Sequence, residues 1–195
     1  MKLNFIFDFG DVLVNFKPRK YLSTLFSDNS IIDKMYDTVF KSKEWLIMDQ
    51  GLLTHKEALE IFCQREPEYK EEIRKTIDNA TDIVSPINET IDLLPIIKSA
   101  GHKLYYLSNM QKEIRAYLLE NHKYIELFDG GIFSCEVHYI KPSPEIYRIL
   151  INKYDLVPGE SIFFDDMAEN VSAAEKEGIK GILFTTAECV LEYLK

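Results

Sequence analysis

Four polar clusters stand out in this chain of 195 residues, because their side chains are of the kinds that bind metals and anions. They are Asp8, Ser108-Asn109, Lys141 and Asp165-Asp166. Three carboxylates at close range repel one another unless a cation lies between them, and Mg²⁺ prefers oxygen ligands of this charge. The hydroxyl and ammonium groups would then remain as donors to an oxygen of an anionic substrate. The residue types therefore point to a magnesium site beside an anion-binding site, provided that the fold brings the clusters together.

The apolar segments around these clusters have the character of buried parallel strands, which are apolar on both faces because helices cover both. The five segments are Leu3–Phe7, Lys103–Leu107, Gly131–Ser134, Ser161–Phe164 and Gly181–Phe184. Helical patterns lie between them. Ser143-Pro144 predicts a helix start, and Ala168–Gly178 predicts a short helix with a glycine stop. Ser85-Pro86 predicts the start of a further helix that runs to Gly101. This alternation predicts an α/β fold, a Rossmann-like parallel sheet with helices on both faces.

The predicted strands would place the polar clusters together. Asp8 follows the first strand, Ser108-Asn109 the second, and Asp165-Asp166 the fourth, while Lys141 comes shortly after the third. The carboxyl ends of parallel strands lie at one edge of the sheet, where open α/β folds bind ligands. We therefore expect one site that contains all four clusters.

Residues 16–84 interrupt the alternation, because their helical patterns include no convincing strand. Nearly 70 residues are too many for a simple crossover between two strands. We therefore expect an α/β core of residues 1–15 and 85–195, and an inserted helical cap domain of residues 16–84 above the first strand. A cap loop around Lys43–Thr54 is expected to set substrate specificity. Asp49 and His55 are cap residues that could face a substrate.

Composition excludes several classes of protein. The net charge of -9 disfavours binding to phosphate backbones, so we expect no nucleic-acid partner. The three cysteines have no metal-ligand spacing, and no segment approaches the ~18 apolar residues of a membrane span. The first residues lack the pattern of a signal peptide. We expect a cytoplasmic protein without a membrane partner, whereas the sequence does not indicate an oligomeric state.

The order of these motifs resembles the four motifs of the haloacid dehalogenase-like hydrolase superfamily, in its helical-cap (C1) subclass. The residues of the motifs are especially similar to those of the α-D-glucose-1-phosphate phosphatase branch, and the resemblance covers essentially the whole chain. The matching segments are Asp8-Phe9-Gly10-Asp11-Val12, Leu107-Ser108-Asn109, Lys141-Pro142 and Phe163-Phe164-Asp165-Asp166.

The resemblance implies a Mg²⁺-dependent phosphatase that acts on a small phosphorylated metabolite. It implies that Asp8 is a nucleophile that forms an aspartyl-phosphate, and that Ser108, Asn109 and Lys141 bind the phosphoryl oxygens. It also implies that Lys141 keeps Asp8 ionised. The implied metal ligands are Asp8, the backbone carbonyl of Gly10, Asp166 and, directly or through water, Asp165.

One position departs from the family pattern. Most phosphatases of this superfamily carry an aspartate two residues after the nucleophile as general acid and base, whereas this chain has Gly10. Asp11 lies one place later, and in an extended segment its side chain would point elsewhere. Without that acid, a substrate with an acidic leaving group should react best, which favours a sugar 1-phosphate.

Two alternatives remain open at this point. A metal-independent 2-haloacid dehalogenase of the same fold would also lack the second aspartate, although such enzymes typically lack the paired acids Asp165-Asp166. A non-catalytic phosphate- and metal-binding module is the other alternative, because the missing acid at Gly10 is compatible with lost activity.

Overall fold

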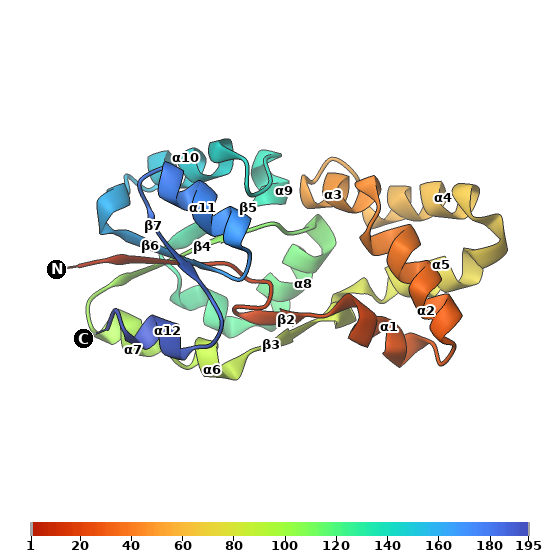
Figure 1. Ribbon diagram of the computed structural model, residues 1–195, viewed down its shortest axis with the longest axis horizontal. Helices are drawn as coiled ribbons and strands as arrows, with labels where there is room; N and C mark the ends of the chain where they lie inside the picture. Colours follow the sequence, from red (N-terminus) through yellow and green to blue (C-terminus); the bar gives the residue numbers. More distant parts are fainter. Residues whose placement is uncertain (1, 195) are drawn as a thin grey trace.

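The computed structural model describes residues 2–194, and its centre is a five-stranded parallel sheet in the order β5-β4-β1-β6-β7 (Figure 1). The strands are β1 Asn4–Phe7, β4 Lys103–Ser108, β5 Gly130–Phe133, β6 Ser161–Asp165 and β7 Lys180–Leu183. Each lies within one residue of a segment predicted as a strand. The central strand β1 pairs with β4 and β6, so that Asn4 lies opposite both Lys103 and Ser161.

Both faces of the sheet are buried, as the apolar segments predicted. Alternate residues of β1 point to opposite faces, so Phe5 and Phe7 enter one core while Ile6 enters the other. The first face packs against α7 Leu94–Ser99, α8 Lys112–Asn121 and α12 Glu188–Leu191, and the second packs against α10 Pro144–Lys153 and α11 Ala168–Lys176. The predicted α/β fold class is therefore confirmed.

Two of the predicted helix boundaries agree with the structure. Ser143 is the N-cap residue of α10, with Pro144 at the first helical position, where a missing N–H is harmless. After α11 the chain turns at Gly178, whose φ of +82° is the left-handed conformation that glycine adopts readily.

The helix predicted from Ser85-Pro86 to Gly101 is wrong at its start and in its continuity. Residues Val84–Pro86 form strand β3, which pairs antiparallel with β2 Val14–Phe16. The helical region then consists of two separate pieces, α6 Asn88–Ile91 and α7. Pro95, in the first turn of α7, has no N–H to donate to the carbonyl of Ile91, which explains why one helix does not run through.

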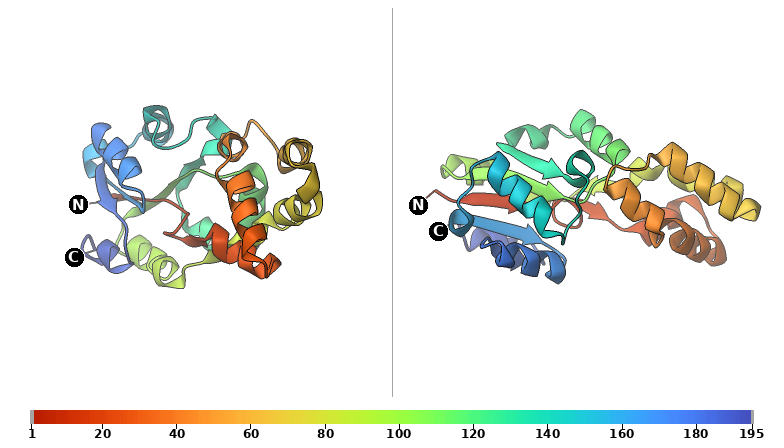
Figure 2. Two further views of the ribbon diagram at one scale, coloured as in Figure 1. Left: turned by 45° about the vertical axis from the view of Figure 1, so that its right-hand side comes forward. Right: turned by 90° about the horizontal axis from the view of Figure 1, so that it is seen from above.

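Between β2 and β3, residues 17–83 contain helices and no strand within the described chain. We call these residues the helical lobe; it extends from the end of the sheet at which β1 leads into β2 (Figures 1 and 2). Its elements are α1 Pro18–Leu25, α2 Asn29–Met35, the π-helix η1 Tyr36–Phe40, α3 Lys43–Asp49, α4 His55–Arg65, η2 Pro67–Tyr69, α5 Lys70–Asp78 and η3 Ala80–Ile83. The remaining short helices of the core are α9 Ser134–Val137, η4 Lys123–Leu127 and η5 Pro158–Glu160.

The loop expected around Lys43–Thr54 is in large part helix α3. Ser42 caps this helix, because its hydroxyl accepts a hydrogen bond from the backbone N–H of Trp45 at 3.1 Å. The helix also buries Trp45 and Met48. A serine cap before these buried residues was the local signal for a helix here.

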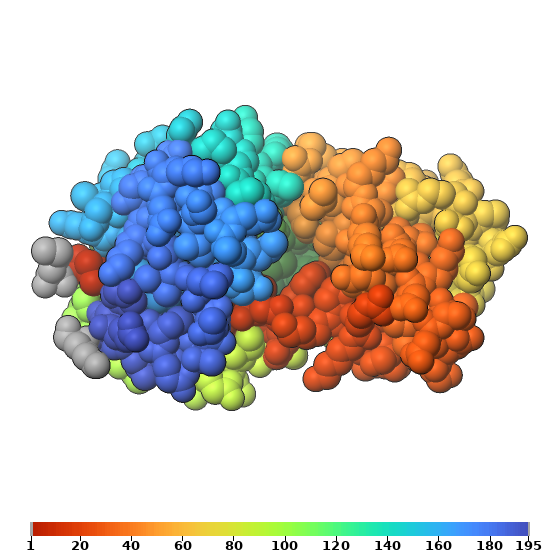
Figure 3. Space-filling view, in the orientation of Figure 1, coloured from red at the N-terminus to blue at the C-terminus, as the bar shows by residue number. Residues whose placement is uncertain are grey.

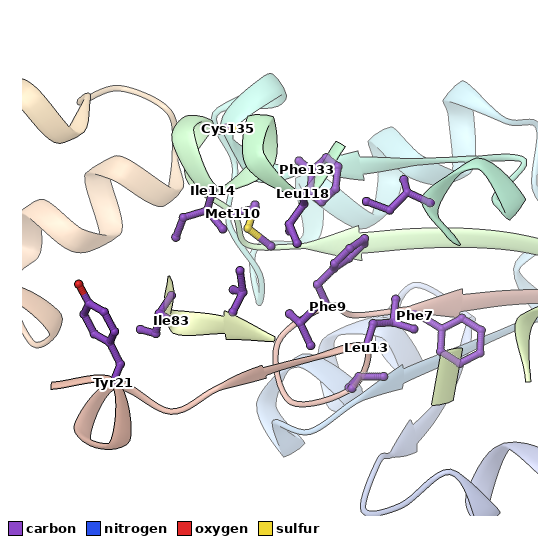
Figure 4. Close-up of a cluster of buried hydrophobic side chains, with 14 of the residues drawn as sticks. Phe7, Phe9, Leu13, Tyr21, Ile83, Met110, Ile114, Leu118, Phe133 and Cys135 are labelled. Atoms are coloured by element: carbon purple, nitrogen blue, oxygen red, sulfur yellow. The ribbon is translucent and has the colours of Figure 1, made fainter. Parts of the chain in front are cut away.

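A continuous apolar cluster joins the lobe to the sheet. Figure 4 shows Phe7 and Phe9 at the end of β1, next to Leu13, with Ile83 and Tyr21 on the lobe side. The lobe is therefore packed on the core through buried side chains. Among residues 2–194, no helix combines the length and the apolar character needed to cross a bilayer.

Gly131 allows the closest side-chain approach within the sheet. It lies opposite Tyr106 in the β4–β5 pair, and a β-carbon at Gly131 would lie 2.3 Å from the Tyr106 ring. We expect Gly131→Ala to lower the free energy of unfolding by about 1–3 kcal/mol, because overpacking moves the ring out of its place. Urea denaturation measures this change.

Gly159→Ala is the matched control, because a β-carbon at Gly159 meets no atom within 4 Å. Its unfolding free energy should change by no more than about 0.5 kcal/mol. Equal denaturation midpoints for the two variants would contradict the packing argument.

Candidate active site

The carboxyl ends of three neighbouring strands bring the predicted polar residues to one place. Asp8 follows β1, Ser108 ends β4 and Asp165 ends β6. All three are buried, with at most 7% of their surface exposed, so they lie in an environment where charge must be balanced locally.

Lys141 supplies that balance from the loop between α9 and α10. Its Nζ atom lies 2.7 Å from Asp8 Oδ1 and 2.6 Å from Asp165 Oδ2, and its side chain is 1% exposed. The side chain of Asn109 fixes the backbone of this loop: its Oδ1 accepts a hydrogen bond from the N–H of Lys141 at 2.7 Å, and its Nδ2 donates to the carbonyl of Lys141 at 3.1 Å. Asn109 therefore positions Lys141 with both ends of its amide.

Asp165 is held by donors on both carboxylate oxygens. Its Oδ1 accepts hydrogen bonds from the backbone N–H of Met167 and from Nδ2 of Asn170, each at 2.9 Å, while Oδ2 faces Lys141. Asp166, in contrast, is exposed. Carboxylate oxygens of Asp8, Asp165 and Asp166 lie within 4.8 Å of one another, close enough to share one metal ion.

The electrostatics of this cluster favour a cation. Burial raises the pKa of Asp8 to about 6, although the charge of Lys141 opposes the rise. Burial also raises the pKa of Asp166, and the charges of Asp165 and Asp11 add to the shift. For Lys141, burial opposes the charged form, but the two neighbouring carboxylates prevail and raise the pKa above its usual value. An additional cation would relieve the repulsion among the acids.

The structure places Ser108 differently from the other predicted residues. Its hydroxyl is close enough to Asp8 to lower the pKa of that carboxyl, and its oxygen lies 3.3 Å from the carbonyl oxygen of Asn109, the alternative acceptor for its one proton. Ser108 is only 1% exposed and does not belong to the cavity wall described below. In this structure the Ser108 hydroxyl therefore lies against Asp8 and is not part of the cavity wall.

Gly10 and Asp11 belong to the turn that follows Asp8. Asp11 has a φ of +52°; its Oδ1 accepts a hydrogen bond from the N–H of Phe16 at 3.0 Å, and its Oδ2 lies 2.8 Å from Lys17 Nζ. The Asp11 carboxylate is therefore engaged within its own loop. The segment is a turn and not extended, so Asp11 also lines the cavity described below, although both of its oxygens already have partners.

A cavity of about 430 Å³ opens between the sheet edge and the helical lobe. Figure 3 shows the corresponding recess between the teal and blue core and the orange lobe. The polar residues and the glycine on its core side include Asp8, Gly10, Asp11, Asn109, Lys141, Asp166, Glu169 and Asn170. The rest of the wall is largely apolar and includes Val14, Phe16, Phe40, Trp45, Leu46, Val84, Met110, Ile114, Ile140 and Met167.

Three further polar residues of the site follow less directly from the sequence. Asn170 holds Asp165, and its place five residues after that acid, in the first turn of α11, was a usable signal. Gln111 and Asp49 also line the cavity. Gln111 was not predicted, because a polar residue just before a helix is ordinary and nothing in its spacing relates it to the lobe.

Comparisons with known proteins agree with this architecture. The family model described as Haloacid dehalogenase-like hydrolase matches residues 5–184. The sesquiterpene phosphatase astK of Aspergillus oryzae is 28% identical over 180 residues, which are 92% of this chain and 88% of that protein. A phosphorylated carbohydrates phosphatase of Thermotoga maritima is 30% identical over 143 residues, which are 72% of this chain and 62% of that protein.

A similar fold occurs in a HAD family enzyme from Bacteroides thetaiotaomicron, whose crystal structure is a complex with magnesium and inorganic phosphate. The TM-score is 0.75 at 20% sequence identity, and the match covers 95% of this chain and 96% of the other. Because the family match spans nearly all of the chain and includes each residue brought together at the sheet edge, the protein belongs to the haloacid dehalogenase-like hydrolases.

Proposed function

We propose that this protein is a phosphatase that hydrolyses a small phosphorylated metabolite through an aspartyl-phosphate on Asp8. The observation that carries the proposal is the position of Asp8 on the cavity wall, beside the ammonium of Lys141 and two further carboxylates. The family and the phosphatase names of both relatives support it.

The contacts of Asp8 support a separate task for each of its oxygens. Oδ1 accepts a hydrogen bond from the backbone N–H of Phe9 at 2.7 Å and faces Lys141 at the same distance, which leaves Oδ2 to attack phosphorus. Lys141 keeps Asp8 ionised and donates to a phosphoryl oxygen. Because Asn109 holds the backbone of Lys141, it contributes to phosphate binding mainly by placing that ammonium.

The acidic cluster fits a bound Mg²⁺, because its oxygens converge within 4.8 Å and part of their charge is unbalanced. Asp8, the carbonyl of Gly10 and Asp166 would hold the ion directly. Asp165 would act through water, since donors already occupy both of its oxygens. When bound, the ion neutralises charge on the phosphoryl oxygens. The magnesium and phosphate in the similar Bacteroides structure support this assignment.

The helical lobe, with the adjoining ends of β2 and β3, would serve as the cap of the helical-cap subclass. This cap would be residues 16–84, inserted after the first motif, with residues 1–15 and 85–195 as the core. Within this subclass, the motifs favour the α-D-glucose-1-phosphate phosphatase branch and a sugar 1-phosphate. The chemical reason is Gly10, because an anomeric oxygen leaves more readily than an ordinary alkoxide.

The apolar wall favours a second candidate substrate, a phosphate monoester of an apolar alcohol. Phe40, Trp45 and Leu46 of the lobe face the same cavity as Asp8 and would exclude water around an apolar group. The names of the two relatives divide in the same way, one being a sesquiterpene phosphatase and the other a phosphorylated carbohydrates phosphatase.

The first test of the proposal is Asp8→Asn. The amide cannot attack phosphorus, so phosphate release from a panel of phosphate monoesters should fall to less than a few per cent of the unaltered protein. Asp11→Asn is the matched control, because it is the same aspartate-to-asparagine change three residues later. The amide oxygen of the new side chain can still accept the hydrogen bond from the Phe16 N–H. Retained turnover in Asp8→Asn would rule out the aspartyl-phosphate.

The second test concerns the metal. EDTA should abolish activity and Mg²⁺ should restore it, and Asp166→Asn should raise the Mg²⁺ concentration needed for half-maximal rate by at least about tenfold, because a charged ligand is lost. Glu169→Gln, an exposed cavity-wall acid outside the cluster, is the control and should leave that concentration unchanged. Full phosphatase activity in EDTA would contradict the proposed metal site.

A third test separates the two candidate substrates. Leu46 is 51% exposed and lines the cavity, so Leu46→Ser should lower kcat/KM for an isoprenyl monophosphate about tenfold, through lost apolar contact, without affecting the fold. The value for glucose 1-phosphate should not change. Leu52→Ser is the control, because Leu52 is 58% exposed but lies outside the cavity wall. A larger loss with glucose 1-phosphate would contradict the apolar candidate.

A further inference from the structure

When the phosphoryl group is transferred to Asp8, the ester oxygen of the departing alcohol needs a proton. Gly10 has no side chain that could donate one. The glycine is not required by crowding, since a β-carbon there would lie 3.9 Å from its nearest neighbour, the β-carbon of Phe16. Asp11 also lines the cavity, but its Oδ1 accepts the Phe16 N–H and its Oδ2 pairs with Lys17. The proton must therefore come from another part of the cavity wall, from the substrate or from water.

Asp49 occupies a suitable place on the opposite wall. It is the last residue of α3, and it lines the same cavity as Asp8 and Lys141. Within the described chain, it is the only ionisable side chain that the helical lobe contributes to this wall. A substrate whose phosphoryl group lies against Asp8 would place its leaving group on the lobe side, next to this carboxyl.

The backbone around Asp49 is fastened to the core. The hydroxyl of Ser134, in α9, donates a hydrogen bond to the carbonyl of Asp49 and accepts one from the N–H of Met110 at 2.9 Å. The Nδ1–H group of His138 donates to the carbonyl of Gln50 at 2.8 Å. Both contacts join the end of α3 to core residues near the site.

Gly51 allows this approach. Its φ is +69°, and a β-carbon at this position would lie 2.4 Å from the carbonyl oxygen of Cys135. The end of α3 therefore lies directly against α9, as Figure 1 also shows. The backbone that carries Asp49 is therefore bound to the core even though it belongs to the lobe.

The environment of the Asp49 carboxyl suits a group that exchanges a proton. Gln111 is buried, and its Oε1 accepts a hydrogen bond from His55 Nε2 at 2.7 Å, which leaves its Nε2 to face Asp49. That nitrogen has no well-aligned acceptor among the described residues. Burial raises the pKa of Asp49 to about 7, against a smaller opposing effect of Gln111. Both the acid and the carboxylate are therefore accessible near neutral pH.

We propose that Asp49 is the catalytic acid and base of this phosphatase, supplied by the helical lobe in place of the residue missing at Gly10. The inference depends on the proposed function. In the first step, Oδ2 of Asp8 bonds to phosphorus, the bond from phosphorus to the ester oxygen breaks, and the Asp49 carboxyl gives its proton to that oxygen. The alcohol leaves, and Asp49 becomes a carboxylate.

The second step returns both residues to their starting state. Water attacks phosphorus and gives a proton to the Asp49 carboxylate, while the bond from phosphorus to Asp8 breaks. Inorganic phosphate, ionised Asp8 and protonated Asp49 result, so atoms and charges balance over the cycle. Loss of the Asp49 carboxyl would therefore impair both steps, but in different ways.

The experiment compares Asp49→Asn with the unaltered protein on phenyl phosphates that differ in leaving-group acidity, with Mg²⁺ present. For unsubstituted phenyl phosphate, kcat/KM should fall about 10²- to 10⁴-fold, the usual contribution of a positioned acid. For 4-nitrophenyl phosphate, kcat/KM should stay within a few fold, because nitrophenolate leaves without a proton.

A second readout reports the hydrolysis step. With 4-nitrophenyl phosphate, Asp49→Asn should release about one nitrophenolate per protein in a rapid burst and then turn over slowly, because the water-activating base is missing. Intact-protein mass spectrometry should then show one added phosphoryl group. A residue that only supported the fold would not produce this burst.

Asp37→Asn is the matched control, because Asp37 is an exposed lobe carboxylate that pairs with Lys41 outside the cavity. It should leave every value unchanged. A uniform loss across all leaving groups in Asp49→Asn, or no loss, would overturn the inference while leaving the phosphatase assignment intact. Absence of phosphatase activity in the unaltered protein would instead overturn the proposed function.

Discussion

The buried ammonium of Lys141 is the group on which the arrangement of the site depends. It lies within 2.7 Å of carboxylate oxygens at the carboxyl ends of two neighbouring strands, where neither Asp8 nor Asp165 is exposed enough for water to screen its charge. Removal of one member of such a buried pair typically costs about 3–5 kcal/mol, because the other charge stays behind without a partner. Several nearby contacts serve this balance: Asn109 fixes the loop that carries the ammonium, and Asn170 and the N–H of Met167 hold the far side of Asp165.

A second constraint is the junction between core and lobe. If the lobe were joined to the core only through β2 and β3, it could rotate relative to the sheet. Apolar contacts would not fix its orientation, because they are not directional. The hydrogen bonds of Ser134 and His138 to the end of α3 are directional, and Gly51 permits the close approach that they require. The polar contacts at α9 therefore determine which lobe residues face Asp8, while the apolar cluster supplies most of the attraction.

The sequence predicted those parts of the fold that depend on residues close to one another in the chain. The apolar segments around Ile6 and Phe163 are covered on both faces, so their composition alone identifies buried parallel strands, and the edge that holds Asp8 and Asp165 follows from topology. The pairing of β2 with β3 joins residues about 70 positions apart, and in segments of three residues it leaves no periodic pattern. Gln111 was missed for the same reason, because its partner His55 lies 56 residues away in the lobe.

The supply of a proton from the lobe would change what limits the choice of substrate. With no acid at Gly10, only an ester with an acidic leaving group should react fast, and this was the chemical argument for a sugar 1-phosphate. If Asp49 gives the proton, an ordinary alcohol can leave as readily as the anomeric oxygen of a sugar. Leaving-group acidity then no longer favours a sugar 1-phosphate. Selection then depends on the wall around Asp49, to which Phe40, Trp45 and Leu46 contribute apolar surface. Since Asp49 and these side chains belong to one short stretch of the lobe, the same segment would both recognise the leaving group and protonate it, while the core handles only the phosphoryl group.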